Sequence, residues 1–416
     1  STTCLGRTVS EMTPAKGYTE MKDSGADWIG KIPATWDISK IGTLYTQRNE
    51  KVSDKDYPPL SVTMKGILPQ LATAAKTDDG DNRKLVRVGD FAINSRSDRR
   101  GSCGISLYDG SVSLINTILI PRKKMHPGYY DWLFHTTLFA DEFYKWGHGI
   151  VDDLWTTRWQ EMKRILVPVP PYETQSAIAA YLDTQCAKID EIIAQAKASI
   201  EDYKQWKASI IYEAVTKGLD PNVEMKDSGI EWIGRMPAHW TAPALKHLCT
   251  MQAGKNLISE QISTSGQYPV YGGNGQRGYY SDYNANGNFL LVGRQGALCG
   301  NVHYVSGNFW ATEHAVVTTP SKITNIRYLY YLLIAMDLNQ YASNSAAQPG
   351  LSVGNILTVK TLLPPIGEQV RISEFLDNGC PKIDEVITEK QSLIDDLESY
   401  KKSLIYEVVT GKRRVV

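Results

Sequence analysis

Several features that would assign the chain to a common functional class are missing from its 416 residues. No apolar run reaches the roughly 18 residues that a membrane-spanning helix needs, and the first residues lack the basic and apolar stretches of a secretory signal. The six cysteines contain no Cys-x-x-Cys pair, and the seven histidines, His303 and His314 among them, form no group with metal-ligand spacing. We therefore expect a reduced, cytoplasmic protein with no metal site and no membrane segment.

Sequence signatures of enzymes are missing as well. Gly272–Gly275 stands in no compact strand–glycine loop–helix unit of the kind that binds dinucleotides, and no Walker loop occurs. Asp220, Glu224 and Lys226 weakly resemble a nuclease site but lack a second suitably placed carboxylate, and Val169–Tyr172 lacks the polar residue with which an amino-methyltransferase holds its target amine. We expect no catalytic residue and no cofactor.

Net charge of one sign is also missing, because 45 basic residues balance 45 acidic ones. The balance differs along the chain, however. Residues 37–167 carry 19 Lys and Arg against 16 Asp and Glu, and residues 241–363 carry 7 against 4. Residues 168–225 carry 5 against 9, and residues 364–416 carry 8 against 10. Two mildly basic blocks thus alternate with two acidic ones, which is compatible with DNA binding without establishing it.

The strongest positive signal is an internal duplication. Residues 20–36 return as residues 224–240 with 12 of 17 positions identical, and we call these two stretches the leading segments. Residues 170–216 return without a gap as residues 364–410 with 21 of 47 identities, where unrelated sequences would give about three. The stretches between the matched parts, 37–169 and 241–363, share no comparable similarity. The chain therefore repeats a common frame around two different heads.

The second part of each repeat has the apolar spacing of a coiled coil, with steps of four and three residues. In the first copy these positions are Ile189, Ile193, Ala196, Ile200, Tyr203, Lys207, Ile210 and Ala214. In the second copy they are Ile383, Ile387, Lys390, Ile394, Leu397, Lys401, Leu404 and Val408. Such helices can pair antiparallel and hold the heads apart; the alternative is two amphipathic helices that each pack on their own head. We expect the second long helix to begin near Pro381, after a shorter helix.

The fold class that follows is α+β, with two mixed α/β heads separated by two long helices in an antiparallel coiled coil with pseudo-two-fold symmetry. We expect an N-terminal tail at 1–17, heads at 18–169 and 219–363, and helices at 170–218 and 364–416. β-Branched stretches predict strands at 59–64, 86–93, 114–121, 288–293 and 315–320. Helices are expected at 129–144 and 326–337, so the two heads could share a fold.

Two segments of the heads carry side chains suited to base edges, since Arg pairs with guanine and Asn or Gln with adenine. The first is the loop 94–101, with Asn94, Arg96, Arg99 and Arg100. The second is a glycine-rich stretch expected to form a mobile loop, with Asn274, Gln276 and Arg277. Further candidates are Arg294, Gln295 and the polar stretch 343–349. The alternative for each residue is an ordinary solvent-exposed loop position.

These residues resemble the specificity subunits of type I restriction–modification systems. The resemblance rests on the leading segments, with their Lys-Asp-Ser-Gly-x-x-Trp-Ile-Gly-x-x-Pro-x-x-Trp pattern, and on the Pro-Pro…Gln…Leu-Asp…Lys-Ile-Asp pattern of the helices. Shorter similarities lie in the heads, at Gly89–Phe91 and at residues 268–275 and 292–296. The first copy departs slightly, because Glu173-Thr174-Gln175 stands where Gly367-Glu368-Gln369 is the commoner form.

The resemblance implies two target-recognition domains that read the halves of an asymmetric, bipartite site in double-stranded DNA. It also implies two docked methyltransferase subunits and, in the full complex, restriction subunits. Methyl transfer to adenine would belong to the methyltransferase partner. The alternative is a structural or assembly scaffold whose heads bind protein; salt dependence of DNA binding separates the two, because only DNA contributes phosphates.

Overall fold

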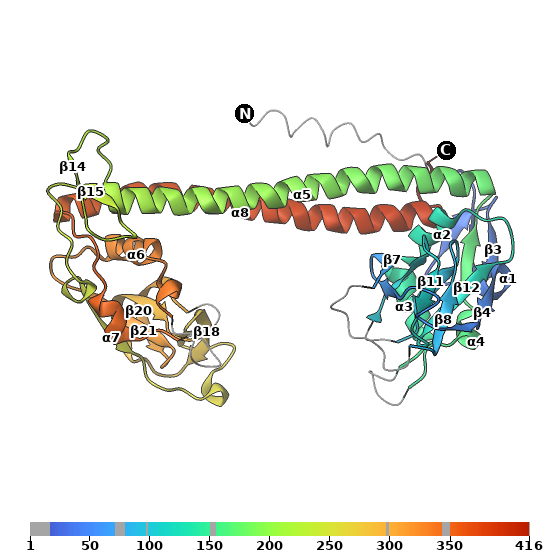
Figure 1. The fold of residues 1–416 in the computed structure, drawn as a ribbon, viewed down its shortest axis with the longest axis horizontal. Coiled ribbons are helices and arrows are strands. Elements are labelled where there is room, and N and C mark those ends of the chain that lie inside the picture. The colour runs from blue at the N-terminus through green and yellow to red at the C-terminus, as the bar shows by residue number, and fades with distance from the viewer. Residues whose placement is uncertain are drawn as a thin grey trace. The chain divides into compact units, whose positions relative to one another are not determined.

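A computed structural model describes residues 17–70, 80–96, 99–149, 155–296, 299–342 and 350–415. The chain divides into two compact units, coloured along the sequence in Figure 1. Unit 1 comprises residues 1–196 and 392–416, and unit 2 comprises residues 197–391. Both boundaries lie inside long helices, so each unit contains one head and a part of each helix. The predicted N-terminal tail lies outside the described residues except for Gly17.

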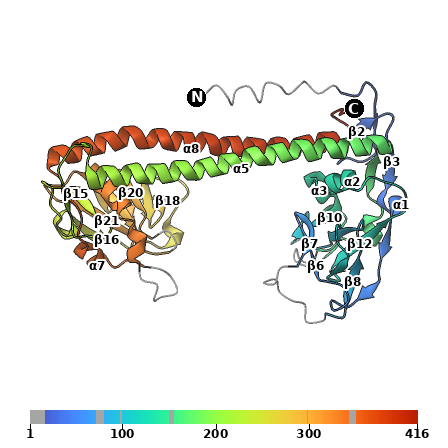
Figure 2. The same ribbon diagram turned by 45° about the horizontal axis from the view of Figure 1, so that its top comes forward.

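The two long helices are α5 (Tyr172–Lys217) and α8 (Ile366–Val409). In unit 1 the end of α8 lies along the start of α5 (Figures 1 and 2), and Lys401 Nζ donates to Asp190 Oδ1 at 2.7 Å. In unit 2 Lys207 Nζ donates to Asp384 Oδ1 at 2.7 Å, and Lys390 lies 5.7 Å from the ring of Tyr203. The helices are therefore antiparallel. Lys207 and Lys401 are equivalent in the two repeats, as are Asp190 and Asp384.

The predicted seam between the helices is confirmed. Its apolar positions are buried at Ile189, Ile193, Ala196, Ile200, Ala214, Ile383, Ile394, Leu404 and Val408. The remaining seam positions are partly buried. Lys207 and Lys401 occupy seam positions with a charged head group, and each finds a carboxylate on the facing helix.

The expected break before Pro381 is wrong, because α8 continues through this residue. Proline in a helix interior removes one backbone hydrogen bond and costs about 3 kcal/mol. Packing around Pro381 offsets this cost, since the nearby Cys380 and Ile383 are both buried. The glycine and proline that suggested a boundary are therefore accommodated inside a packed helix.

Each head is built on a four-stranded antiparallel arrangement with the same strand order. In unit 1 the order is β10 (Cys103–Ile105), β9 (Phe91–Asn94), β12 (Asn116–Pro121) and β4 (Tyr45–Arg48). In unit 2 it is β20 (Val302–Ala311), β19 (Ala285–Gly293), β21 (Ala315–Pro320) and β16 (Cys249–Ala253). The unit 2 sheet adds β17 (Tyr268–Gly272) and β18 (Gly275–Tyr280) beyond β20. The two heads thus share a core topology despite their dissimilar sequences.

Two expected elements of the first head are each divided. The expected strand at 86–93 forms β8 (Arg83–Val86) and β9, separated by a turn in which Gly89 has φ +88°. The expected helix at 129–144 forms α2 (Pro127–Phe134) and α3 (Thr137–Lys145). Thr136 divides them, because its side chain accepts from Phe139 N and caps the second helix. In unit 2 the expected helix at 326–337 is α6 (Ile326–Ala335).

The remaining elements are short. Unit 1 contains β1 (Met21–Asp23), β2 (Lys31–Pro33), β3 (Asp37–Lys40), α1 (Ile41–Leu44), β5 (Lys51–Val52), β6 (Leu60–Thr63), β7 (Gly66–Pro69), β11 (Gly110–Val112), α4 (Trp159–Met162) and β13 (Leu166–Val169). Unit 2 contains β14 (Met225–Asp227), β15 (Arg235–Pro237) and α7 (Val353–Thr358), with 3-10 turns η3 (Leu245–His247), η4 (Ser259–Gln261) and η5 (Leu338–Tyr341). No described helix is long and apolar enough to cross a membrane.

Duplicated contacts attach each head to both helices. In unit 1 Gln175 Oε1, on α5, accepts from His126 N at 2.9 Å, and Tyr129 OH donates to Val409 O, on α8, at 2.8 Å. The equivalent bond in unit 2 joins Gln369 on α8 to Asn325 N at 2.7 Å.

The leading segments are held in the same way. Tyr406 donates to the carbonyl of Ile29 at 3.2 Å, and Tyr212 donates to that of Ile233 at 3.3 Å. The repeated sequence therefore forms the joints between heads and helices.

Candidate nucleic-acid interface

The first candidate segment is the connection between β9 and β10 at the end of the unit 1 sheet. Asn94 is buried, and its side-chain oxygen accepts from Arg96 N at 3.0 Å, so this amide shapes the loop. Arg96 is exposed, while its carbonyl accepts from Tyr144 OH at 2.8 Å. The loop backbone is thus fixed while the guanidinium of Arg96 faces solvent.

The other two arginines of this connection are also exposed, but each makes contacts with nearby residues that constrain it. Arg100 forms an ion pair with Asp141 and lies 5.7 Å from the ring centroid of Tyr144. Arg99 N donates to Arg96 O at 3.3 Å, which closes a turn. Arg100 is consequently held against α3, and a base contact by this residue would require the ion pair to open.

The corresponding connection of unit 2 joins β19 to β20 and carries Arg294 and Gln295, both exposed. Arg294 N donates to His314 O at 2.9 Å, and Arg294 O accepts from Leu351 N at 2.9 Å. Within the described residues the Arg294 side chain has no hydrogen bond or ion pair. Here too a fixed backbone presents a cation to solvent.

Backbone hydrogen bonds show that the two connections are equivalent. Asn94 N donates to Ser102 O at 2.9 Å in unit 1, and Gly293 N donates to Asn301 O at 2.9 Å in unit 2. Each connection also pairs with a later segment, through the bridges Arg96↔Thr156 and Gln295↔Gly350. Arg96 and Gln295 therefore occupy the same position in the shared fold. The sequence predicted both segments as candidates, but it could not align them.

The glycine-rich segment of the second head is a β-hairpin and not the mobile loop that we expected. β17 and β18 pair antiparallel and are joined by the two-residue turn Gly273–Asn274. Gly-Asn followed by Gly275, with φ +100°, between Tyr- and Val-containing strands is a hairpin signal that the sequence analysis missed.

The three candidates of the hairpin lie at or beyond its turn, and all are exposed. Asn274 Oδ1 accepts from Asn301 Nδ2 at 2.9 Å, which joins the turn to the end of the β19–β20 connection. Gln276 donates to Gly278 O at 3.5 Å. Arg277 has no side-chain partner among the described residues. The hairpin and the Arg294 connection therefore adjoin one another.

Two polar residues near the Arg96 connection, the partly buried Lys84 and the buried Asn116, were not among the candidates. Lys84 Nζ donates to Asn116 O at 2.6 Å, and burial lowers the pKa of this lysine. Asn116 pairs with Asn94 across β12 and β9 and is buried with its Oδ1 atom unpaired. These residues are far apart in sequence, so only the sheet register brings them together. The polar stretch 343–349 and residues 97–98 lie outside the described residues.

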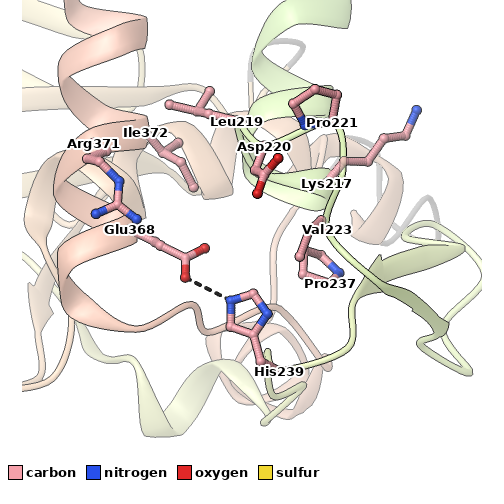
Figure 3. Close-up of a pocket in the computed structure, with 11 residues that line it drawn as sticks. Lys217, Leu219, Asp220, Pro221, Val223, Pro237, His239, Glu368, Arg371 and Ile372 are labelled. Atoms are coloured by element: carbon pink, nitrogen blue, oxygen red, sulfur yellow. Dashed lines mark hydrogen bonds and ion pairs between the residues drawn. The ribbon is translucent and has the colours of Figure 1, made fainter.

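A separate pocket lies in unit 2 where α5 ends and α8 begins (Figure 3). Its volume is about 420 Å³, and Asp220, His239, Glu368 and Arg371 are among its lining residues. Glu368 accepts from His239 Nε2 at 2.8 Å and from Trp240 Nε1 at 2.9 Å. Burial alone would raise the pKa of Glu368, but these hydrogen bonds and the nearby cations lower it.

None of the candidate base-contacting residues lines this pocket, and its charges are mixed. Among the described residues no group of three or more His, Cys, Asp or Glu side chains is arranged to hold a metal ion. Lys226, considered above for a nuclease site, donates to the backbone oxygens of Ala238 and Trp240 at 2.6 and 2.8 Å. That lysine therefore stabilises the second leading segment.

Comparisons with known proteins agree on one family. Residues 237–393 match the family described as type I restriction modification DNA specificity domain. The specificity subunit of the EcoprrI type I restriction enzyme of Escherichia coli is 47% identical over 137 residues, which cover 32% of this chain and 34% of that protein. A putative specificity subunit of the MjaX type I restriction enzyme of Methanocaldococcus jannaschii is 22% identical and covers 93% of this chain and 96% of its own length.

Solved structures resemble the whole fold. A chain from a study of complex assembly and conformational transition of the type I R-M system matches with a TM-score of 0.70 and 13% identity, covering 91% of this chain and 98% of that one. The HsdS subunit of Thermoanaerobacter tengcongensis matches with a TM-score of 0.50 and 14% identity, covering 92% and 98%. At these identities the likeness concerns the fold alone. The match to the E. coli protein spans about a third of that relative's length.

Proposed function

We propose that this chain, which belongs to the specificity subunits of type I restriction–modification systems, reads a bipartite DNA site with its two heads. Each head would contact one half-site through one connection of its sheet, the one from β9 to β10 in head 1 and the one from β19 to β20 in head 2. Arg96 in head 1 and Arg294 in head 2 are the residues expected to contribute most. Arginine can donate two hydrogen bonds to the O6 and N7 atoms of guanine in the major groove.

The observation that carries this proposal is the equivalence of the two candidate connections. They follow equivalent strands, close with the same backbone hydrogen bond and pair with equivalent later segments, yet their side chains differ. Positions that keep the backbone while changing the side chains are suited to reading different bases. Unlike heads on a duplicated frame would then recognise an asymmetric site.

The chemistry of modification would belong to partner subunits. We propose that two methyltransferase subunits dock on the duplicated frame and that restriction subunits join the full complex. The chain itself would act without a catalytic residue or cofactor, as a cytoplasmic DNA-binding component. Its neutral net charge fits this role if the partners supply part of the cationic surface that neutralises DNA phosphates.

The test is long-read sequencing of DNA from cells that express this chain with the methyltransferase subunit of its system. The expected result is one motif of methylated adenines, composed of two short, unlike half-sites around a fixed gap. Arg294→Ala should relax or abolish one base position in one half-site, and Arg96→Ala should affect only the other half-site. Loss of an arginine that contacts a base reduces the free energy of DNA binding by about 1–3 kcal/mol and relaxes specificity at that base position.

Matched controls are available at the opposite end of each sheet. Lys123 and Lys322 are exposed cations that follow β12 and β21, so Lys123→Ala and Lys322→Ala should leave the motif unchanged. If a soluble complex with an active methyltransferase yields no motif, the heads bind something other than DNA, as in the scaffold alternative. If the motif persists unaltered in both arginine variants, the reading surface lies elsewhere on the heads.

A further inference from the structure

The hairpin of β17 and β18 (Figure 1) lies against the connection between β19 and β20, which carries Arg294. A Cβ atom built on Gly273, in the turn of the hairpin, would stand 3.6 Å from Gly293 Cα and 3.7 Å from Arg294 N, at the start of the connection. Asn274, the next residue of the turn, accepts a hydrogen bond from Asn301 at the end of the connection. The turn therefore contacts both ends of the connection, and the hairpin and the connection form one surface of head 2.

Arg277 is the extra residue of a β-bulge in this hairpin. Val270 pairs with Gly278 and Tyr271 pairs with Gln276, so no residue of β17 stands opposite Arg277. A bulge releases its extra residue from the regular alternation of the strand and can re-aim the side chain. Arg277 is also the one charged residue between positions 268 and 280, and it is exposed. The hairpin thus departs from regular pairing at its single cation.

Gly272, on the facing strand, leaves the space in which the side chain of Arg277 lies. A Cβ atom built on Gly272 would stand 2.6 Å from Arg277 Cδ and 3.2 Å from Arg277 Cγ. The aliphatic part of the arginine therefore lies across the facing strand, where only a glycine gives it room. The backbone of Gly272 does not require glycine, because its φ is not positive. The missing side chain at this position consequently sets the direction of Arg277.

The charges along this surface favour an anionic ligand. Residues 261–312 include both the hairpin and the connection, and they contain two arginines and a single acidic residue, Asp282. Asp282 follows β18 at the end of the strand away from the turn. The next carboxylate along the chain belongs to Glu313, whose Oε1 atom lies 3.3 Å from Nε2 of His314. Within the part of the chain that the structure describes, neither arginine side chain has an ion pair.

We propose that Arg277 contacts a phosphate of the DNA backbone while Arg294 contacts a base edge. The inference rests on the proposed function, which places the Arg294 connection on DNA. The contacts through Gly272 and Gly273 hold the Arg277 side chain on the order of 10 Å from the Arg294 backbone. The major groove is about 12 Å wide, so a cation at this distance from a residue in the groove reaches the phosphates along its rim. Such a contact fixes the register of head 2 on the duplex without reading sequence.

The first experiment measures the salt dependence of DNA binding. The complex of this chain with the methyltransferase subunit is titrated onto a duplex that carries the methylated motif, at several salt concentrations. Loss of one phosphate contact reduces the slope of log affinity against log salt concentration by about 0.9, and we expect this change for Arg277→Ala. Arg277→Lys retains the charge and should keep the slope. Lys322→Ala removes an exposed cation at the opposite end of the sheet and should also keep it.

The second experiment moves the charge without removing it. The methyl group of Gly272→Ala meets a flexible side chain and no backbone atom among its nearest neighbours, so the melting temperature should stay unchanged. The slope should nevertheless fall as it does for Arg277→Ala. Gly272 is a positioning residue that acts through the arginine, so adding Gly272→Ala to Arg277→Ala should weaken binding no further. Additive losses would show that the glycine matters for another reason.

A second duplex with scrambled half-sites separates a phosphate contact from a base contact. Arg277→Ala should weaken binding to both duplexes by the same factor, whereas Arg294→Ala should weaken binding mainly to the motif. An unchanged slope for Arg277→Ala, or a loss confined to the motif duplex, overturns the inference and leaves the proposed function intact. Equal binding of the unchanged complex to both duplexes would instead overturn the proposed function, and the inference with it.

Discussion

Asp90 of head 1 is a buried charge with an ionic partner, and its contacts fix a turn that the surrounding sequence alone would not specify. Asp90 is 3% exposed and accepts from Arg48 Nε at 2.8 Å and from Arg87 N at 2.9 Å. It thereby closes the turn that leads into β9, the strand before the Arg96 connection. The Gly89-Asp90-Phe91 sequence suggested a family likeness, and the structure shows its physical role.

Removing Asp90 should destabilise head 1. Asp90→Ala leaves the largely buried guanidinium of Arg48 without its main partner, and breaking such a pair costs about 3–5 kcal/mol. The melting temperature of unit 1 should fall by several degrees. Glu50→Ala is the control, because Glu50 is 56% exposed and lies 3.8 Å from the same arginine. Equal melting temperatures for both variants would contradict this account of the Asp90 turn.

Asp377 makes the attachment of head 2 sensitive to acid. Burial alone would raise the pKa of its carboxyl group, but hydrogen bonds from Arg327 and Tyr331 and the charge of Arg327 outweigh burial and lower it. A carboxyl group whose pKa is lowered by folding stabilises the native state above its unfolded pKa of about 4, and this stabilisation is lost as the pH falls toward the folded value.

We therefore expect the stability of the Asp377→Asn variant to depend less on pH in the acidic range. Between about pH 5 and pH 3 its melting temperature should fall less than that of the unchanged chain. Asp396→Asn, at an exposed position of α8, should follow the unchanged profile. Parallel profiles for all three chains would show that the Arg327–Asp377 pair contributes nothing to the pH dependence.

At the scale of elements, the long helices pair along a seam in which three lysines, Lys207, Lys390 and Lys401, replace apolar residues. Lys207 with Asp384 and Lys401 with Asp190 are equivalent pairs, one in each unit, and they set the same antiparallel register. The seam could be predicted because its period of seven residues is visible in the sequence. The continuity of α8 through Pro381 could not, since it depends on contacts with α5.

Charge exchange tests the register of the helices. Lys401→Asp and Asp190→Lys should each lower the free energy of unfolding. The loss of a partly exposed ion pair costs roughly 0.5 kcal/mol, and the like charges that then face each other add to this cost. The double variant should recover most of the loss, giving a coupling energy in a double-mutant cycle measured by urea unfolding. The same exchange at Lys207 and Asp384 should give a similar coupling. Purely additive effects would mean that these residues are not partners in solution.

At the scale of the whole molecule, the proposed reading of two half-sites predicts how the gap between them depends on helix length. Residues 194–200 of α5 and 388–394 of α8 are equivalent heptads that lie between the two ion-paired positions of each helix. Deleting both heptads keeps the seam and both ion pairs in register. Each helix shortens by roughly 10 Å, which corresponds to about three base pairs of DNA.

The expected outcome of the double deletion is a methylated motif with the same two half-sites and a gap shorter by a few base pairs. Long-read sequencing scores both features in one experiment. Deletion of the heptad from α5 alone is the control, because it shifts the seam and should prevent assembly. Altered half-site bases with an unchanged gap would contradict the role of the helices as spacers.

Features that repeat or have a regular period could be predicted from the sequence. The duplication, the coiled-coil seam, most strands and the family likeness follow from identities and spacings within short stretches of chain. The sequence also predicts the exposed Arg96, Arg294 and Arg277 as base-contacting candidates, because an arginine in a loop can form two hydrogen bonds with guanine.

Features that depend on residues far apart in the chain become visible only in the folded structure. The equivalence of Arg96 and Gln295 follows from strand order and backbone bonds, because the two heads share no sequence from which to align them. The joining of Asn274 to Asn301, and the position of Lys84 beside Asn116, come from strand pairing across tens of residues. The pocket shown in Figure 3 arises where the end of α5, the start of α8 and the second leading segment meet. Local sequence patterns do not predict how segments far apart in the chain pack against one another.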